Sequence, residues 1–227
     1  MESKHKKKIY LYYQFERFWH WAQAALIFLL IVTGFEIHST FHLFGYDTAV
    51  RWHNTAGWLL IGLIITAIFW HIVTGQWKNY VPTTKKLWEQ VLYYLFGIFR
   101  NAPHPTHKTI TSKLNPLQRI VYLGLKVVIL PAMVLSGLLY MFYRFPQGSR
   151  IASFSIGGIE LETIAVIHTA GAFLVVAFVI IHLYLISTGS TPGSNLKAMI
   201  TGWEDLEEEE AHEAEDHKKK EKKEIQH

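Results

Sequence analysis

Two histidines in the second half of the chain have a spacing that suits metal ligation inside a helix bundle. His168 and His182 are 14 residues apart in an apolar stretch. In an α-helix this spacing gives a rise of roughly 21 Å and returns to within roughly 40° of the same face. Neutral imidazole is a good iron ligand. One helix would therefore present two iron ligands on one side, as two stacked haems require.

Each haem then needs a second ligand at the same depth. His20 begins an earlier apolar stretch and His53 begins the next one. In a bundle whose helices alternate in direction, His20 matches the depth of His182, and His53 matches that of His168. The sequence predicts two haem b groups with bis-histidine ligation, an inner pair His20–His182 and an outer pair His53–His168. The alternative is that these rings only hydrogen-bond neighbouring helices.

His71 leaves the inner ligand set open. It follows His53 by 18 residues, which is five helical turns and the same face. It could replace His20 as the inner ligand, contact a quinone or a haem propionate, or lie at the membrane interface beside Trp70 and Trp77.

Two cations could face a haem propionate. Arg17 is one turn before His20, and Lys126 lies some 15 Å into an apolar stretch at a helical rise. An unpaired ammonium is costly at that depth, so Lys126 should face a haem, a propionate or a polar cavity, with snorkelling as the weaker alternative. Gly57 and Gly171 either leave room for a flat macrocycle or allow close helix packing.

The elements that must position these residues follow from composition. Half of the 227 residues are hydrophobic, 18% are charged and none is cysteine. The absence of cysteine excludes disulfides, iron–sulfur clusters held by this chain and covalent haem attachment. The basic residues lie beside long apolar runs, so we expect no nucleic-acid partner.

Four apolar stretches reach the length of about 20 residues that a membrane span needs. They cover about residues 18–37, 52–74, 117–143 and 163–187. The first is too long for a secretory signal and has no cleavage site after it. The sequence therefore predicts an all-α integral membrane four-helix bundle.

Lysine and arginine flank the spans unevenly. They gather before the first span and between the second and third, which places both termini in the cytoplasm. We expect a basic segment over residues 1–16, the membrane domain over 17–190 and a charged tail over 203–227 that is disordered or loosely helical. Residues 83–100 should form an amphipathic helix along the cytoplasmic interface, or one packed on a partner subunit.

The sequence resembles the cytochrome b subunits of NiFe-hydrogenases, respiratory formate dehydrogenases and thiosulfate-reductase-like complexes. The resemblance covers about residues 10–190 and rests on the following motifs: Arg17-Phe18-Trp19-His20-Trp21 with Thr33-Gly34, Arg51-Trp52-His53 with Gly57, Asn115-Pro116-Leu117-Gln118 with Ser136-Gly137, and His168 to His182-Leu183-Tyr184. In that family the haem ligands come from spans one, two and four. The family also includes compact cytochromes that oxidise superoxide.

The resemblance also implies a quinone pocket beside the inner haem. The corresponding residues are Asn115, Gln118 and His182, and His71 is a further candidate. The alternative for Asn115-Pro116 is structural, with Asn as the N-cap of span three and Pro in its first turn.

We therefore expect a multi-pass protein of the bacterial cytoplasmic membrane that transfers electrons between an extracytoplasmic partner and quinone or menaquinone. The partner would be an iron–sulfur or multihaem cytochrome subunit docked on the outer loops, residues 35–51 and 144–161. The chain would anchor a respiratory complex in the lipid, could form a homo-oligomer within it, and would complete no substrate reaction alone. The rivals are a stand-alone quinone-linked cytochrome that oxidises superoxide and a haem-free membrane scaffold or transporter.

Overall fold

The computed structural model describes residues 6–100, 102, 105, 113–144, 160–188, 191 and 193–207. Among these residues, four helical segments are long and apolar enough to cross a membrane: Gln14–Ile37, Tyr46–Val73, Pro116–Phe142 and Leu161–Ile186. Helices α1 (Gln14–Ile37), α2 (Tyr46–Val73) and α6 (Leu161–Ile186) supply three of them. The remaining span is built from α4 (Pro116–Gly124), the π-helical turn η4 (Leu125–Ile129) and α5 (Leu130–Arg144). The predicted all-α membrane bundle is confirmed.

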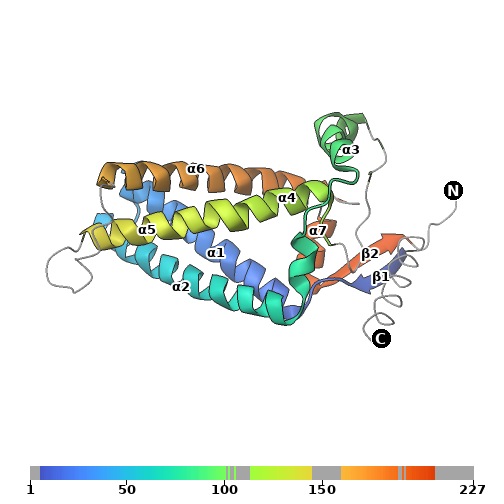
Figure 1. The fold of residues 1–227 in the computed structure, drawn as a ribbon, viewed down its shortest axis with the longest axis horizontal. Helices are drawn as coiled ribbons and strands as arrows, with labels where there is room; N and C mark the ends of the chain where they lie inside the picture. Colours follow the sequence, from blue (N-terminus) through green and yellow to red (C-terminus); the bar gives the residue numbers. More distant parts are fainter. Residues whose placement is uncertain are drawn as a thin grey trace. The chain divides into compact units, whose positions relative to one another are not determined.

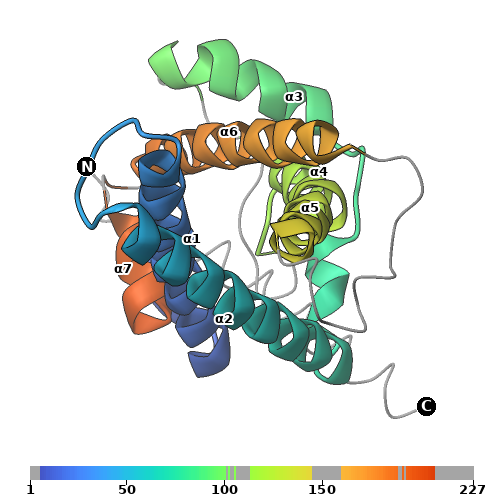
Figure 2. The same cartoon turned by 90° about the vertical axis from the view of Figure 1, so that its left-hand side faces the viewer.

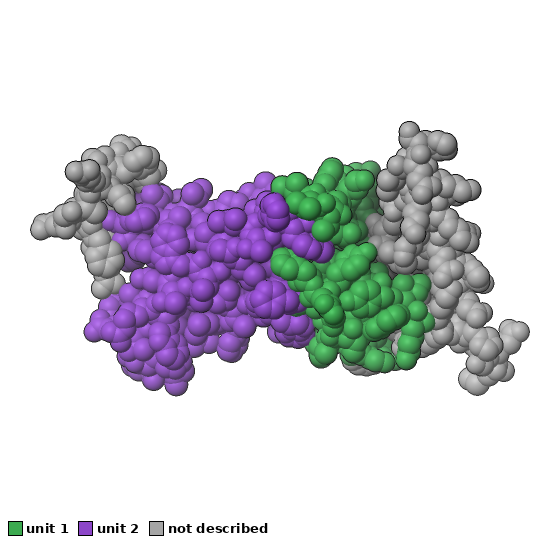
Figure 3. Space-filling model, turned by 90° about the horizontal axis from the view of Figure 1, so that it is seen from below, with its two compact units in different colours: residues 1–17, 71–124, 184–227 green, residues 18–70, 125–183 purple. Residues whose placement is uncertain are grey.

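The chain divides into two compact units, coloured separately in Figure 3. Unit 1 comprises residues 1–17, 71–124 and 184–227, and unit 2 comprises residues 18–70 and 125–183. Unit 2 holds the greater part of α1, α2, α5 and α6, whose ribbons Figures 1 and 2 show from two perpendicular directions. All four predicted haem-ligating histidines belong to unit 2.

A stripe of three alanines and one leucine lies on the buried face of α2. Ala49, Ala56, Leu60 and Ala67 are all at least 93% buried. The last three follow Ala49 by 7, 11 and 18 residues, and each of these spacings returns close to the same helical face. Small side chains let membrane helices approach closely. His53 is one turn after Ala49 and therefore lies near this stripe.

The carboxylate of Glu36 organises the connection from α1 to α2. It accepts hydrogen bonds from the backbone N–H groups of Leu43, Phe44 and Gly45 at 2.9, 2.6 and 2.7 Å. These groups lead into the first turn of α2, where a carboxylate is favourable because the helix N-terminus carries partial positive charge. This capping explains why α2 begins at Tyr46, six residues before the predicted start of the span.

Span three is interrupted by a wider turn that the sequence analysis did not include. The π-helical turn η4 ends two residues before Pro131. Proline has no N–H to donate, and its ring clashes with the carbonyl of the preceding turn, so the helix widens there. Lys126 lies inside this turn.

Unit 1 contains a two-stranded antiparallel sheet that the sequence analysis did not predict. Strand β1 (Lys6–Tyr10) pairs with β2 (Trp203–Glu207), with Lys6 opposite Glu207 and Tyr10 opposite Trp203. The expectation of a disordered or loosely helical tail is therefore wrong for residues 203–207. The remainder of the tail, residues 208–227, lies outside the described residues.

A short helix leads into this sheet. Helix α7 (Ser194–Thr201) ends at Gly202, whose φ of 87° is in the left-handed region that favours glycine. The Gly202 carbonyl accepts hydrogen bonds from the N–H groups of Leu11 and Tyr12. A Cβ at Gly202 would lie 2.6 Å from the Tyr10 ring, so glycine is also required for space.

The middle connection begins with η1 (Gln76–Tyr80) and continues as a helical segment from Leu87 to Arg100. Its parts are α3 (Leu87–Leu92), the π-helical turn η2 (Tyr93–Gly97) and η3 (Ile98–Arg100). The predicted helix over 83–100 thus starts later, after Lys86, whose φ is 58°. Trp88 and Phe99 are 70% and 75% exposed, as expected for a helix lying at a membrane surface.

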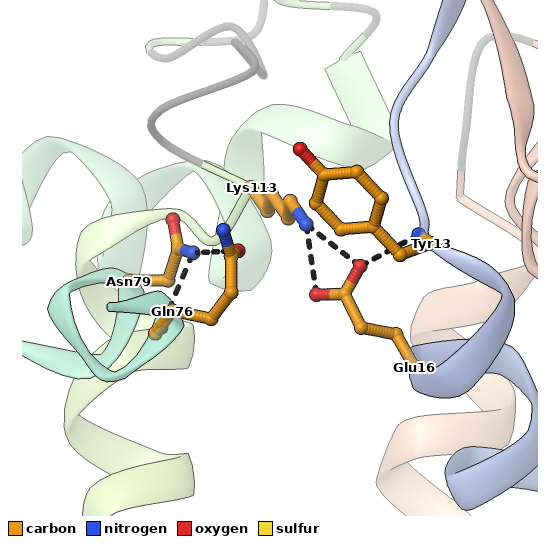
Figure 4. Close-up of polar contacts among 5 residues, drawn as sticks. All are labelled: Tyr13, Glu16, Gln76, Asn79 and Lys113. Atoms are coloured by element: carbon orange, nitrogen blue, oxygen red, sulfur yellow. Dashed lines mark hydrogen bonds and ion pairs between the residues drawn. The ribbon is translucent and has the colours of Figure 1, made fainter. Parts of the chain in front are cut away.

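A buried ion pair joins this connection to the start of α1 within unit 1. Figure 4 shows the Lys113 ammonium directed at the carboxylate of Glu16, with Gln76 and Asn79 hydrogen-bonded to each other nearby. Glu16 also accepts a hydrogen bond from the N–H of Tyr13 at 2.8 Å. The first turn of α1 is capped in this way, so the helix begins at Gln14, four residues earlier than predicted.

Candidate functional site

The outer histidine pair lies between α2 and α6 in unit 2. The ring centroids of His53 and His168 are 6.3 Å apart, and the ring planes are inclined at 70°. Each histidine is in the eighth position of its helix. The structure therefore brings together the two residues that the sequence analysis paired by depth.

Thr33 on α1 holds the His53 ring. Its Oγ1 lies 2.9 Å from His53 Nδ1 and donates its own proton to the Leu29 carbonyl at 2.7 Å. Because a hydroxyl has one proton, Oγ1 can only accept from the histidine, and Nδ1 carries the hydrogen. The lone pair of this neutral ring is therefore on Nε2.

Ser136 on α5 holds the His168 ring in the same way. Its Oγ donates to the Ala132 carbonyl at 2.6 Å and lies 3.0 Å from His168 Nδ1. The same proton count places the hydrogen on Nδ1 and the lone pair on Nε2. Both outer histidines thus present the nitrogen that is ready to bind a metal.

A glycine follows each of these hydroxyl residues and lies beside the histidine ring. A Cβ at Gly34 would lie 3.5 Å from His53 Cε1, and a Cβ at Gly137 would lie 3.2 Å from His168 Cε1. We call Thr33-Gly34 and Ser136-Gly137 the two hydroxyl–glycine pairs. Each is on the helix that precedes its histidine in the chain, so the same local arrangement occurs twice.

The inner pair joins α1 to α6 within unit 2. The ring centroids of His20 and His182 are 6.2 Å apart. Phe178 stacks on His182 with ring planes only 13° apart, and Trp21 meets His20 edge-on. His20 Nδ1 is buried and has no hydrogen-bond partner among the described residues, so no hydroxyl corresponding to Thr33 holds this ring.

The donor sets fit haem iron. A metal–imidazole bond is about 2 Å long, so two such bonds and the half-width of two rings span roughly 6 Å, which is the separation seen at both pairs. No group of three or more candidate metal ligands occurs in the part of the chain that the structure describes. Two histidines alone suit an iron whose other four ligands come from a porphyrin.

The glycines near these histidines have different surroundings. A Cβ at Gly57 would meet no atom within 4 Å, whereas a Cβ at Gly171 would lie 2.5 Å from Met133 Sδ. Gly171 therefore serves close packing of α5 on α6. Gly57 borders open space, and a role in leaving room for a macrocycle stays a prediction.

The two predicted propionate contacts have protein partners. Lys126 Nζ lies 5.0 Å from the centroid of the Trp19 ring, in range of a cation–π interaction. In unit 1, Arg17 Nη1 donates to the Ile200 carbonyl at 2.6 Å, where a cation is favourable near the C-terminus of α7. A propionate role for either residue stays a prediction.

Asn115 and Gln118 form a reciprocal cap at the start of α4. Asn115 Oδ1 accepts from the Gln118 N–H at 2.8 Å, and Gln118 Oε1 accepts from the Asn115 N–H at 3.0 Å. The capping role considered for Asn115 is therefore confirmed. Its Nδ2 also donates to the hydroxyl of Tyr94 at 3.0 Å, and the quinone role stays a prediction.

His71 lies in unit 1 against Tyr80. Its exposed fraction is 8%, and the two ring centroids are 5.4 Å apart. The ring that faces His182 belongs to His20.

The functional residues that the sequence analysis did not identify are Thr33 and Ser136. Both appeared only as parts of short motifs, without a role. The sequence does contain a pattern that could have drawn attention to these residues: at two places inside an apolar span, a hydroxyl residue is followed by glycine.

The comparisons with known proteins and the four membrane-spanning helices identify a membrane-embedded b-type cytochrome that takes part in electron transfer, a multi-pass protein of the inner membrane. The chain belongs to the prokaryotic cytochrome b561 family, whose model matches residues 11–202.

Individual relatives agree with this family. The chain is 33% identical over 209 residues to "Putative cytochrome YdhU" of Escherichia coli (strain K12), covering 88% of this chain and 76% of that protein. It is 27% identical over 220 residues to a protein of Azotobacter chroococcum named "Probable Ni/Fe-hydrogenase B-type cytochrome subunit", covering 86% and 88%. A protein of the same name from Cupriavidus necator is 25% identical over 230 residues, covering 88% of each chain.

Proposed function

We propose that this protein binds two haem b groups, one between His20 and His182 and one between His53 and His168. The observation that carries the proposal is the near-equal separation of the two ring pairs, 6.2 and 6.3 Å. Both pairs include a residue of α6, and their positions 14 residues apart on that helix separate the sites by roughly 21 Å. When bound, haem supplies a one-electron couple of its iron.

We further propose that the chain transfers electrons between an extracytoplasmic redox subunit and the quinone or menaquinone pool. Relatives named as hydrogenase cytochrome subunits support a partner of this kind. The partner would carry iron–sulfur clusters or several haems, and it would dock on the outer loops. Glu36 supports this role because its three backbone hydrogen bonds give the first outer loop a fixed shape.

Quinone contact at the start of α4 is supported by the polar groups gathered there. The Asn115 amide donates to the Tyr94 hydroxyl, and burial raises the pKa of this phenol above its ordinary value. Quinone reduction needs protons as well as electrons. Asn115→Ser retains an N-cap and removes the amide, so this variant should keep its haem and lose quinol-driven haem reduction. An unchanged rate would contradict the quinone role.

Haem content tests the ligand assignment. Purified wild-type protein should contain two haem b per chain by pyridine haemochrome assay. His168→Ala and His182→Ala should each contain one, and the remaining haem should differ between the two variants in its reduction potential. The ligand pairing is wrong if both variants retain two.

Gentle detergent extraction tests the partner. We expect a subunit with iron–sulfur clusters or several haems to travel with the chain. A chain that purifies alone and is reduced by superoxide would favour the stand-alone cytochrome.

A further inference from the structure

His53 and His168 of the outer pair differ from His20 of the inner pair in what holds the Nδ1 atom. At the outer pair both Nδ1–H groups donate to hydroxyls, those of Thr33 and Ser136. At the inner pair His20 Nδ1 has no hydrogen-bond partner among the described residues.

A hydrogen bond from Nδ1–H makes the imidazole a more basic ligand through Nε2. Each hydroxyl here also donates to a backbone carbonyl, Leu29 for Thr33 and Ala132 for Ser136. Donating polarises the hydroxyl oxygen and strengthens it as an acceptor, because hydrogen bonds in a chain reinforce one another. A more basic axial ligand stabilises ferric over ferrous iron, since the oxidised metal carries the greater charge.

We propose that Thr33 and Ser136 are positioning residues that fix His53 and His168 as Nε2 ligands and lower the reduction potential of the outer haem. The inference rests on the proposed ligation of haem by these histidines. In both hydroxyl–glycine pairs the hydroxyl orients the ring, and at Gly137 the missing side chain also leaves space for the His168 ring. The two pairs act from different helices, so their effects on the potential should add.

The test is an optical redox titration of the purified holoprotein, which resolves the midpoint potentials of the two haems. Thr33→Val replaces the hydroxyl by a methyl group of similar size, and Ser136→Ala removes the second hydroxyl. Each variant should shift the outer midpoint upward and leave the inner midpoint in place, and the double variant should show the sum. Thr33→Ser, which keeps a hydroxyl, should restore the wild-type value.

Thr66→Val is the matched control. Thr66 Oγ1 donates to the Gly62 carbonyl at 2.9 Å and its side chain is exposed on α2, so the substitution removes the same kind of back-bond without touching a histidine. It should shift neither midpoint. Equal shifts in Thr33→Val and Thr66→Val would overturn the proposal, and so would unchanged midpoints in both Thr33→Val and Ser136→Ala.

Haem loss is also informative. If Thr33→Val loses one haem and Thr33→Ser retains two, the positioning role is supported directly. If Thr33→Val does not fold, Ser136→Ala asks the same question from the other helix. A wild-type protein without two haems would contradict the proposed ligation itself, whereas two haems with midpoints indifferent to both hydroxyls would contradict only this inference.

Discussion

The ammonium group of Lys113 lies 2.8 Å from each carboxylate oxygen of Glu16, although the two residues are 97 positions apart in the chain. Both side chains are nearly buried, with 5% and 11% of their surface exposed. The same ammonium lies 4.9 Å from the centroid of the Tyr13 ring. This pair ties the end of the middle connection to the first turn of α1 inside unit 1 (Figure 4).

Breaking this pair from one side should be costly. Glu16→Gln keeps an oxygen that can accept from the Tyr13 N–H but leaves the Lys113 charge buried without its counter-charge. Removing one partner of a buried ion pair typically costs about 3–5 kcal/mol. We expect Glu16→Gln to lower the stability of the purified protein by this order, measured by chemical unfolding in detergent.

The double variant Glu16→Gln/Lys113→Met is the control. It removes both charges, so it should recover most of the lost stability. The difference between the double variant and the sum of the single variants measures the coupling of the two side chains. Additive effects would show that the ion pair contributes nothing beyond its separate parts.

Two half-buried tyrosines, Tyr12 and Tyr80, predict loss of stability in strong base. Burial, and then the charge of nearby carboxylates, raises the pKa of Tyr12 and of Tyr80 above the usual value of about 10. The unfolded chain loses these protons near pH 10 while the folded protein keeps them. Their contribution to stability is therefore complete below about pH 10 and is lost as the pH rises further.

Thermal unfolding measured between pH 9 and pH 11 tests whether stability falls as the pH rises. The unfolding temperature should fall with pH in the wild type and fall less in Tyr80→Phe. Lys113 changes the stability in the opposite direction as the pH rises, because burial lowers the pKa of its ammonium group more than the charge of Glu16 raises it. In Lys113→Met the unfolding temperature should therefore fall more steeply with pH than in the wild type. A shallower fall would refute this effect of Lys113.

The sequence predicted the spans and the histidine pairs because both depend on local periodicity. The 14-residue spacing of His168 and His182 fixes their face and separation on one helix. Alternation of the spans then assigns His20 to the depth of His182 and His53 to the depth of His168. These are the residues whose rings the structure places 6.2 and 6.3 Å apart.

Contacts between distant segments could not be predicted in this way. Strand β1 pairs with β2 across almost the whole chain, and no local pattern in the charged tail indicates its partner. Thr33 and His53 are 20 residues apart on different helices, so their hydrogen bond depends on helix rotation. The π-helical turn was accessible in principle, because Pro131 inside an apolar span signals a disturbed helix.

A graded series of glycine substitutions should separate ring clearance from general helix effects. A Cβ at Gly137 would lie 3.2 Å from His168 Cε1, a tight approach to a ring that Ser136 holds in place. At Gly34 the corresponding distance to His53 is 3.5 Å, an ordinary contact. We expect Gly137→Ala to alter the spectrum or occupancy of the outer haem, and Gly34→Ala to leave both nearly unchanged.

Gly62→Ala is the control for this series. A Cβ there would meet no atom within 4 Å, so the variant tests only the preference of a helix for alanine. It should retain both haems. An outer haem lost equally from Gly62→Ala and Gly137→Ala would mean that the glycines act through the helix and not through the ring.

The choice between His20 and His71 can be decided by comparing two alanine variants. His20 faces His182, whereas His71 is 8% exposed and packs against Tyr80. We expect His20→Ala to lose the inner haem and to match His182→Ala in both haem content and remaining midpoint potential. His71→Ala should retain two haems per chain, because its ring contributes packing in unit 1 and, if the quinone proposal holds, a contact to quinone.

Quinol-driven haem reduction distinguishes these two roles of His71, since loss of packing alone would leave the rate of haem reduction unchanged. One haem in His71→Ala together with two in His20→Ala would reverse the assignment of the inner ligand.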